Sequence, residues 1–429
     1  MALGQNLHKI NKSFMNDESR FKKIQINDIP IMIGIHDEII CVPRGEEVFA
    51  AAIVGSSGTG KTLLANRFIS GLYHQWDANI AIMNDVSEET YKWSEPMTNK
   101  NFNLLNEKYL NQLPAPSPLV YLFPNSKTIT LPKDFKKNFV KTTLPFRDII
   151  ENIGFYLKGV SPDFSLGKSE LYVNDIKEDL ANCDSVSSVK EVLEDQLPGQ
   201  EGKSFQAMRV KIMTAFAALM REEILDITNP ECPAYLQTEG DFEGNPLSVL
   251  MKAGWIPSFI TSDLITKRYK SEVFAYYINE IFQNNLKDFP GEKTFLFFDE
   301  LKDVCTRDDE PAAQSIGRVA ARGRINNVGL IYCTQFYDKI PHSVRGAKLN
   351  YCFSFAHSNN EIVRQIGSDF DLDSDEKKKI KNLKKFEVLA MTNNKFVIYR
   401  DGERFEETKP MKGTIFPPLA NHLKRGNND

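Results

Sequence analysis

The chain has 429 residues, which is enough for one large hydrophobic core or two ordinary ones. Hydrophobic residues make up 41% and charged residues 26%, as in soluble globular proteins, and no run of about 18 apolar residues indicates a membrane span. The N-terminus lacks the apolar core of a signal peptide, and the net charge of −4 provides no global basic field for nucleic acid, although a ring could keep basic residues in a central channel.

Residues 1–27 are predicted to be an N-terminal extension, and residues 28–85 the first part of an α/β nucleotide-binding core. Residues 28–42 predict one or two short strands. The apolar run "VFAAAIVGSS" predicts a buried strand of a parallel sheet, and "KTLLANRFISGLYHQW" an amphipathic helix over 61–76. A second strand is expected over 78–85, ending at Asp85.

Residues 86–253 show a different pattern and predict a large, mainly helical inserted subdomain. Helix-like segments such as 203–225 alternate with proline-rich breaks such as 113–124. Locally basic stretches lie at 133–141 and 377–385, and a solvated helix face explains each of them equally well.

Residues 254–385 are predicted to complete the core as strands alternating with helices, which favours a parallel sheet. The expected strands are "WIPSFITSDL", "KTFLFFDE", "VGLIYCTQ" and "YCFSFAHS"; the expected helices are "YKSEVFAYYINEIFQNNL" and "PAAQSIGRVAARGRI". In the C-terminal part, 386–429, residues 386–402 predict a β-hairpin that turns at Asn393 and Asn394.

Residues 55–62, "GSSGTGKT", match the P-loop pattern between a strand and a helix. The glycines let backbone N–H groups converge on phosphate oxygens, Lys61 would bridge the β- and γ-phosphates of ATP, and the Thr62 hydroxyl would ligate Mg²⁺. The residues expected to contact the nucleotide are Gly55, Ser56, Ser57, Gly58, Thr59, Gly60, Lys61, Thr62 and Leu63.

Two adjacent carboxylates end the predicted strand 294–298. Asp299 would hold Mg²⁺, and Glu300 would polarise the attacking water. An acid in the place of Glu300 indicates hydrolysis used for work, not transfer of phosphate to a small acceptor.

Two further features lie close after this strand. Gln335 ends a third apolar strand, where its amide could touch the γ-phosphate or its water; an ordinary surface position is the alternative. Arg322 and Arg324, with Arg318 nearby, could stabilise transition-state charge on the nucleotide of a neighbouring subunit, or could simply be a solvated basic helix end.

These pieces, in this order, resemble the FtsK–HerA superfamily of hexameric P-loop motor ATPases. The matching segments are "IVGSSGTGKT", "IAIMNDVSEE", "TFLFFDE", "ARGRINNVGLIYCTQ" and "IPHSVRGAKLNYCFSFAHSNNEIVRQIG", over roughly 30–85 and 255–370. The resemblance implies a RecA-like P-loop fold, a homohexamer, and catalytic roles for Lys61, Glu300, Gln335, Arg322 and Arg324. Relatives have a different sequence after the position of Asp85, so its role stays open.

The chain also departs from several members of that superfamily. Too few residues precede the first predicted strand for the β-barrel of HerA-like helicases, and the membrane helices and winged-helix DNA reader of FtsK-type pumps are not evident. What remains resembles compact motors such as viral packaging ATPases or plasmid-borne translocases.

The function expected from the sequence is an ATP-driven hexameric motor that translocates double-stranded DNA, in genome packaging or plasmid transfer. An ATP-switched scaffold with a protein partner, such as a capsid, and a protein-moving secretion-type ATPase are the alternatives. The candidate pore-lining cations for DNA lie in 133–147 and 203–211.

The cysteines and histidines suggest no metal centre. The six cysteines show no metal-ligand spacing and predict reduced thiols in a cytoplasmic setting, in a host cell or virion if the protein is viral. His342 and His357 lie near the nucleotide end of the predicted sheet, where a plain surface or core role is expected.

Overall fold

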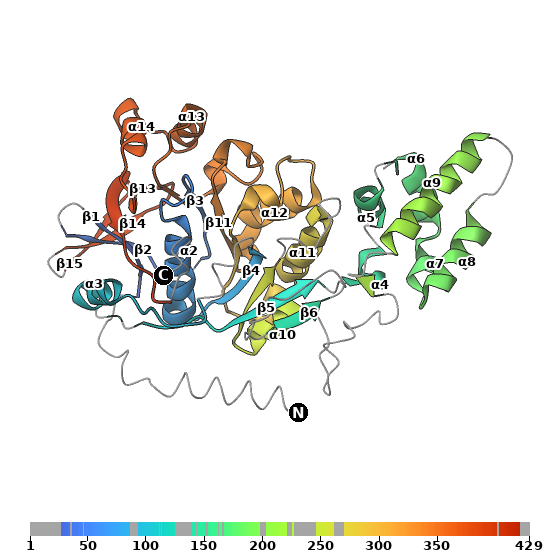
Figure 1. The fold of residues 1–429 in the computed structure, drawn as a ribbon, viewed down its shortest axis with the longest axis horizontal. Coiled ribbons are helices and arrows are strands. Elements are labelled where there is room, and N and C mark those ends of the chain that lie inside the picture. The colour runs from blue at the N-terminus through green and yellow to red at the C-terminus, as the bar shows by residue number, and fades with distance from the viewer. Residues whose placement is uncertain are drawn as a thin grey trace, which may run out of the picture.

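The computed structural model describes residues 27–34, 37–45, 47–85, 93–110, 112, 114–124, 139–142, 144–150, 153–161, 163–164, 167–197, 203–220, 225–226, 246–260, 270–400 and 403–420. In this part of the chain, one 14-stranded mixed sheet forms the centre of the molecule (Figure 1). Its order is β15-β14-β2-β1-β16-β13-β12-β3-β11-β10-β4-β9-β5-β6.

The strands from β12 to β6 in this order run parallel to one another. They are β12 (Tyr351–Ser354), β3 (Ala50–Val54), β11 (Val328–Thr334), β10 (Thr294–Phe298), β4 (Asn79–Asp85), β9 (Ile256–Ile260), β5 (Leu119–Pro124) and β6 (Phe139–Thr142). The residues of β3, β10 and β11 are buried throughout, which explains why these strands read as continuous apolar runs.

Helices cover both faces of this parallel region. Ala51 and Ile53 of β3 belong to one core with α2 (Lys61–Trp76). Ala50, Ala52 and Val54 belong to the opposite core, with α10 (Pro246–Lys252), α11 (Lys270–Asp288) and α12 (Pro311–Asn326). The expected parallel sheet flanked by helices is therefore confirmed.

The remaining sheet is antiparallel and joins the two ends of the described chain. It comprises β13 (Glu387–Thr392), β16 (Met411–Ile415), β1 (Ile29–Gly34), β2 (Ile39–Val42), β14 (Phe396–Arg400) and β15 (Glu403–Glu407). Strand β16 lies between β1 and β13, so it connects β1 and β2 to the parallel region of the sheet.

The C-terminal hairpin is present, but its strands are β14 and β15. The predicted pairing across Asn393 and Asn394 is wrong, because β12 and β16 occupy both edges of β13, and β2 and β15 occupy both edges of β14. Long-range partners have displaced the local pairing that the turn sequence favours.

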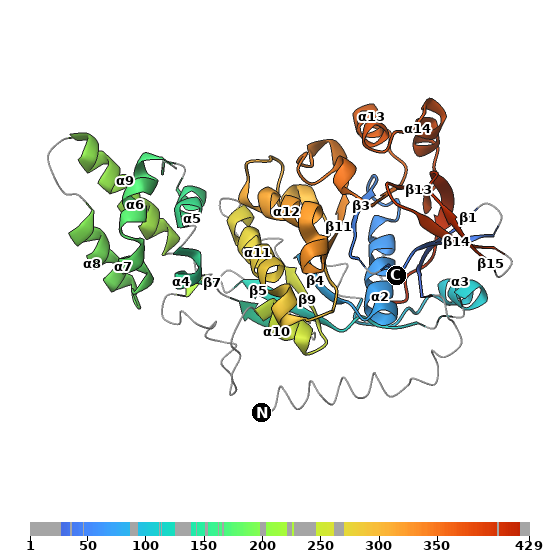
Figure 2. The same cartoon turned by 180° about the vertical axis from the view of Figure 1, so that it is seen from behind.

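The range 86–253 contributes strands to the main sheet as well as helices. β5 and β6 extend the parallel region beyond β9. The helices of the range are α3 (Lys100–Leu110), α4 (Phe146–Ile149), α5 (Ile153–Val160), α6 (Lys168–Asp175), α7 (Lys177–Ala181), α8 (Val186–Gln196) and α9 (Lys203–Leu219), and a short pair of strands joins β7 (Leu144–Pro145) to β8 (Leu225–Asp226). Both views show α5 to α9 as a group at the β6 end of the molecule (Figures 1 and 2).

The remaining elements are short or lie near the C-terminal strands. They are η3 (Leu301–Asp303), η4 (Tyr337–Lys339), η5 (Gly346–Lys348), α13 (Asn360–Asp369) and α14 (Ser374–Lys381). Five cysteines are free and buried, and Cys232 lies outside the described residues. None of the helices in the described ranges has the length and apolar character needed to cross a membrane.

Candidate functional site

The predicted site residues follow three neighbouring parallel strands at one edge of the sheet. The phosphate loop follows β3, the two carboxylates follow β10, and Gln335 follows β11, which lies between these two strands. Val54 is paired with Thr334, and Tyr332 with Phe298, so the three strands end close together. Ligands of open α/β sheets bind at this carboxyl edge.

The loop 55–60 has the close approaches and the backbone geometry that require glycine at two positions. A Cβ on Gly55 would lie 2.6 Å from Cβ of Phe355, which closes the space behind the loop. Gly60 has a φ of 123°, in the region that L side chains rarely adopt. The Thr59 hydroxyl donates to the carbonyl of Ser56 over 2.8 Å and holds the turn together.

The first turn of α2 is suited to an anion. It contains no acidic residue, and no side chain caps its N-terminus. Its first N–H groups and the positive end of the helix dipole therefore remain available for phosphate oxygens. The Lys61 ammonium donates to the Ser56 carbonyl over 3.0 Å, within the same loop, and its side chain is largely buried.

Glu300 is buried and bound to the neighbouring strand. Thr334 Oγ1 donates to Glu300 Oε1 over 2.7 Å. The backbone N–H of Gln335 lies 3.3 Å from Oε1 and 3.2 Å from Oε2. Because Glu300 is only 9% exposed, these hydrogen bonds compensate a large part of the cost of burying its carboxylate.

The pKa of Glu300 is raised, chiefly because burial disfavours the charged carboxylate. The hydrogen bonds from Thr334 and Gln335 and the charge of Lys61 act in the opposite direction, and Asp303 raises the pKa further. A carboxylate with a raised pKa accepts a proton more readily, as a general base for water requires.

Thr62 and Asp299 are the predicted metal ligands. Thr62 is the second residue of α2, and Asp299 directly follows β10. A hydroxyl at the start of α2 and a carboxylate after β10 suit Mg²⁺, which takes few protein ligands and the oxygens of a bound phosphate. Asp85 ends β4, the strand beside β10, while the segment 86–89 lies outside the described residues.

One contact at this site carries no sequence signal. The His357 ring nitrogen Nε2 lies 3.0 Å from the Gln335 carbonyl, and the His357 side chain is buried. The sequence suggested only a surface or core role for this histidine.

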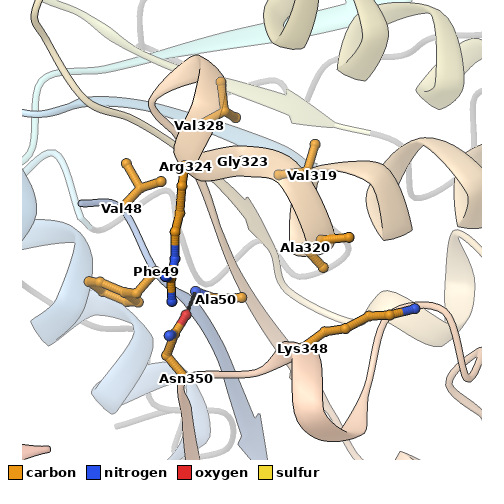
Figure 3. Close-up of a pocket in the computed structure, with 11 residues that line it drawn as sticks. Val48, Phe49, Ala50, Val319, Ala320, Gly323, Arg324, Val328, Lys348 and Asn350 are labelled. Atoms are coloured by element: carbon orange, nitrogen blue, oxygen red, sulfur yellow. Dashed lines mark hydrogen bonds between the residues drawn. The ribbon is translucent and has the colours of Figure 1, made fainter. Parts of the chain in front are cut away.

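The predicted arginines lie at the opposite edge of the sheet. Arg324, near the end of α12, lines a pocket of about 320 Å³ that also includes Ala50 and Val328, the first residues of β3 and β11. Its side chain points toward Asn350, whereas Lys348 points away from it (Figure 3). Arg324 forms an exposed ion pair with Glu47 at 3.0 Å, and Arg322 is exposed.

The length of β3 therefore separates Arg324 from the phosphate loop of its own chain. The structure does not bring Arg322 or Arg324 together with Lys61 and Glu300.

The basic segments are described only in part. Residues 125–138 lie outside the described residues, and so do the side chains of 139–145. Lys211 on α9 is exposed, and Arg209 donates to the carbonyl of Glu194 over 2.9 Å. Lys377, Lys378 and Lys379 lie on α14, where Lys378 pairs with Asp375.

Comparison with known proteins gives similarity in structure only. No protein-family model matches the sequence, and no curated protein matches it. The structure is similar to that of VirB4 of Thermoanaerobacter pseudethanolicus, with 13% sequence identity, 90% of this chain and 96% of that chain covered, and a TM-score of 0.55.

It is also similar to the plasmid coupling protein TrwB in complex with the non-hydrolysable ATP analogue ADPNP, with 13% identity, 94% of each chain covered and a TM-score of 0.51. The unbound form of the bacterial conjugative coupling protein TrwBdeltaN70 gives 12% identity, 90% of each chain and a TM-score of 0.50. These similarities fit the resemblance to the FtsK–HerA superfamily and confirm the P-loop NTPase fold.

Proposed function

We propose that the protein is an ATP-hydrolysing motor that works as a ring of identical subunits, a homohexamer, and translocates double-stranded DNA. The observation that carries the ATPase assignment is the convergence of the phosphate loop, the Asp299–Glu300 pair and Gln335 at the ends of three adjacent strands. This arrangement is supported by the hydrogen bonds that tie Glu300 to Thr334 and Gln335.

The loop and the start of α2 are proposed to hold the triphosphate of ATP. Backbone N–H groups of 57–63 would surround the phosphates, because those of Gly55 and Ser56 donate to the carbonyls of Thr334 and Ala356. The Lys61 ammonium would leave the Ser56 carbonyl and bind the β- and γ-phosphates. Thr62 and Asp299 would hold Mg²⁺, which would supply positive charge against that of the phosphates.

Glu300 is proposed to take a proton from the attacking water. Its burial raises the pKa of the carboxylate, and two donors from β11 fix its orientation. Gln335 follows the same strand, and its side-chain amide is proposed to contact the γ-phosphate or the water. Positioning of these groups before reaction is the main contribution that a protein makes to phosphoryl transfer.

Arg324 is proposed to act on the nucleotide of a neighbouring subunit, with Arg322 as the second candidate. The position of Arg324 in a pocket at the far edge of the sheet supports action between chains, since it cannot reach its own phosphate loop. Each site is then complete only when two copies of the chain meet.

The DNA substrate is proposed from the resemblance and from the coupling proteins of similar fold. TrwB is a plasmid and conjugative coupling protein, and both TrwB structures cover at least 90% of this chain. Cations of 133–147 and 203–211 are the candidate phosphate contacts.

The test is ATP turnover of the purified full chain with and without linear double-stranded DNA, at about 50 mM and about 200 mM salt. Stimulation by DNA that falls steeply with salt is the expected result, and Glu300→Gln serves as the blank for contaminating ATPases. Turnover that DNA leaves unchanged would overturn the DNA motor and leave an ATPase with a protein substrate or a scaffold role. The net charge of −4 is compatible with this second outcome, because it provides no global basic field for DNA.

A further inference from the structure

The main chain of Gln335 is hydrogen-bonded on both sides. Its N–H donates to the carboxylate of Glu300, at 3.3 Å and 3.2 Å from the two oxygens. Its carbonyl lies 3.0 Å from Nε2 of His357. The main chain of Gln335 is thus held between Glu300, the candidate base, and His357, which follows β12.

The chemistry of this contact defines the state of the histidine. A carbonyl oxygen only accepts, so Nε2 of His357 must carry the hydrogen and donate it. Burial lowers the pKa of His357, and the charge of Lys61 lowers it further, whereas the Gln335 contact and Asp338 raise it. The ring is therefore neutral at pH 7, with Nδ1 unprotonated.

The other ring nitrogen argues against a role in packing alone. His357 is 7% exposed, and Nδ1 has no hydrogen-bond partner within the described part of the chain. An unsatisfied buried acceptor destabilises the folded state, and a leucine or phenylalanine of similar volume would avoid that cost. The Nε2–H bond to Gln335 is the one feature of the ring that an apolar residue could not supply.

His357 is also linked to the phosphate loop. The carbonyl of the preceding residue, Ala356, accepts from the N–H of Ser56 at 3.3 Å, and Phe355 N donates to the Val54 carbonyl over 2.8 Å. The strand that leads to His357, β12, pairs with β3. The phosphate loop and the main chain of Gln335 are therefore hydrogen-bonded to two consecutive residues, Ala356 and His357.

We propose that His357 is a positioning residue: it fixes the main chain of Gln335 and thereby sets the placement of the Gln335 amide and of the Glu300 carboxylate for hydrolysis. This inference rests on the proposed ATPase function. Because the proposed role of His357 acts through the main chain of Gln335, its loss should lower kcat and leave the KM for ATP nearly unchanged.

Two amide substitutions separate this role from a structural one. In His357→Gln the amide nitrogen is as many bonds from Cα as Nε2, so it can still donate to Gln335. In His357→Asn the nitrogen takes the place of Nδ1 and cannot reach. His342→Asn, at an exposed position near the same edge, is the matched control.

The measurements are kcat, KM and the thermal unfolding midpoint of the full chain and the three variants. We expect His357→Asn to lower kcat on the order of 10-fold with KM within about 2-fold, and His357→Gln to stay within about 3-fold of the wild type in kcat. The control should match the wild type in all three quantities.

Three outcomes would overturn the inference. An unchanged kcat in His357→Asn would overturn the inference about His357 and leave the proposed ATPase function standing. Equal losses of kcat in both His357 variants, with equally lowered unfolding midpoints, would indicate a structural role and would have the same consequence. A wild-type protein without Glu300-dependent ATP hydrolysis would overturn the proposed function together with it.

Discussion

Thr334 and Glu300 form a 2.7 Å hydrogen bond between the ends of two adjacent parallel strands. The hydroxyl of Thr334 donates to Glu300 and accepts from the N–H of Phe336 at 3.0 Å, so its orientation is fixed from both sides. Thr334 is fully buried, and the hydrogen of its hydroxyl group, its only polar side-chain group, is donated to the candidate base. The bond stabilises the charged carboxylate against its burial and sets how readily Glu300 takes a proton.

Substitution Thr334→Val should move the acidic limb of the pH–rate profile to higher pH. Valine keeps the shape but removes the donor, so the ionised form of Glu300 is less stable and its pKa rises. The measurement is kcat/KM between about pH 5 and pH 9 for the wild type and the variant. Thr334→Ser keeps the hydroxyl and should retain the wild-type limb; a limb at the same pH in all three proteins would contradict this role.

Substitution Glu300→Gln should lower ATP turnover by about 10²- to 10⁴-fold while nucleotide binding is retained. The amide oxygen still accepts from Thr334, so the site keeps its shape and loses only the base. Phosphate release and binding of a fluorescent ATP analogue measure the two effects separately. Lys61→Ala is the comparison, because it should lose nucleotide binding as well. Wild-type turnover in Glu300→Gln would exclude Glu300 as the base.

The same substitution should change how the stability of the nucleotide-free protein depends on pH. Because burial raises the pKa of Glu300 in the folded state, its contribution to stability is greatest below the unfolded pKa and is lost as pH rises through the folded pKa. Glu300→Gln has no such loss, so its stability relative to the wild type should increase with pH. Urea midpoints in the presence of a chelator, from about pH 4 to pH 8, measure this difference. A difference that stays flat would contradict it.

Substitution Arg324→Ala should abolish turnover through the neighbouring site. We expect a loss on the order of 10³-fold in the assembled protein with unchanged ATP affinity. Mixing Arg324→Ala with Lys61→Ala should restore activity, because the second variant supplies an intact arginine to the intact phosphate loop of the first. Arg318→Ala, on the exposed side of the same helix, is the control. Mixtures as inactive as either variant alone would argue against action between chains.

Substitution Gly323→Ala should destabilise the protein by about 1–3 kcal/mol. The added Cβ would lie 2.0 Å from the carbonyl oxygen of Val328, a main-chain atom that can yield only if β11 shifts. Arg322→Ala, at the preceding exposed position, should change the free energy of unfolding by no more than about 0.5 kcal/mol. Denaturant unfolding of both variants provides the test, and equal effects would contradict the steric argument.

The parts of the site that could be predicted from sequence are those with a local pattern. The start of α2 follows from Gly60, and β10 and β11 are continuous apolar runs because helices cover both faces of the sheet. The polar residues after these runs then had to meet at one edge, because parallel strands end on the same side.

The parts that could not be predicted depend on pairing between distant segments. The Asn393–Asn394 turn signal is local, whereas the true partners of its flanking strands, β16 and β2, are set by burial across the whole sheet. No sequence pattern predicts the contact of His357 with Gln335 either. The acceptor is a main-chain carbonyl, which every residue possesses, so the residue type at position 335 gives no indication of this hydrogen bond.

The position of β16 has a consequence for how a newly made chain reaches its native state. β1 is synthesised long before its partner β16, since Met32 pairs with Ile415. The backbone N–H and C=O groups along one edge of the apolar β1 therefore have no strand partner until the intervening segments have been translated. Such an edge invites pairing with other nascent chains, and we expect the protein to depend on chaperones or low expression temperature for a good yield.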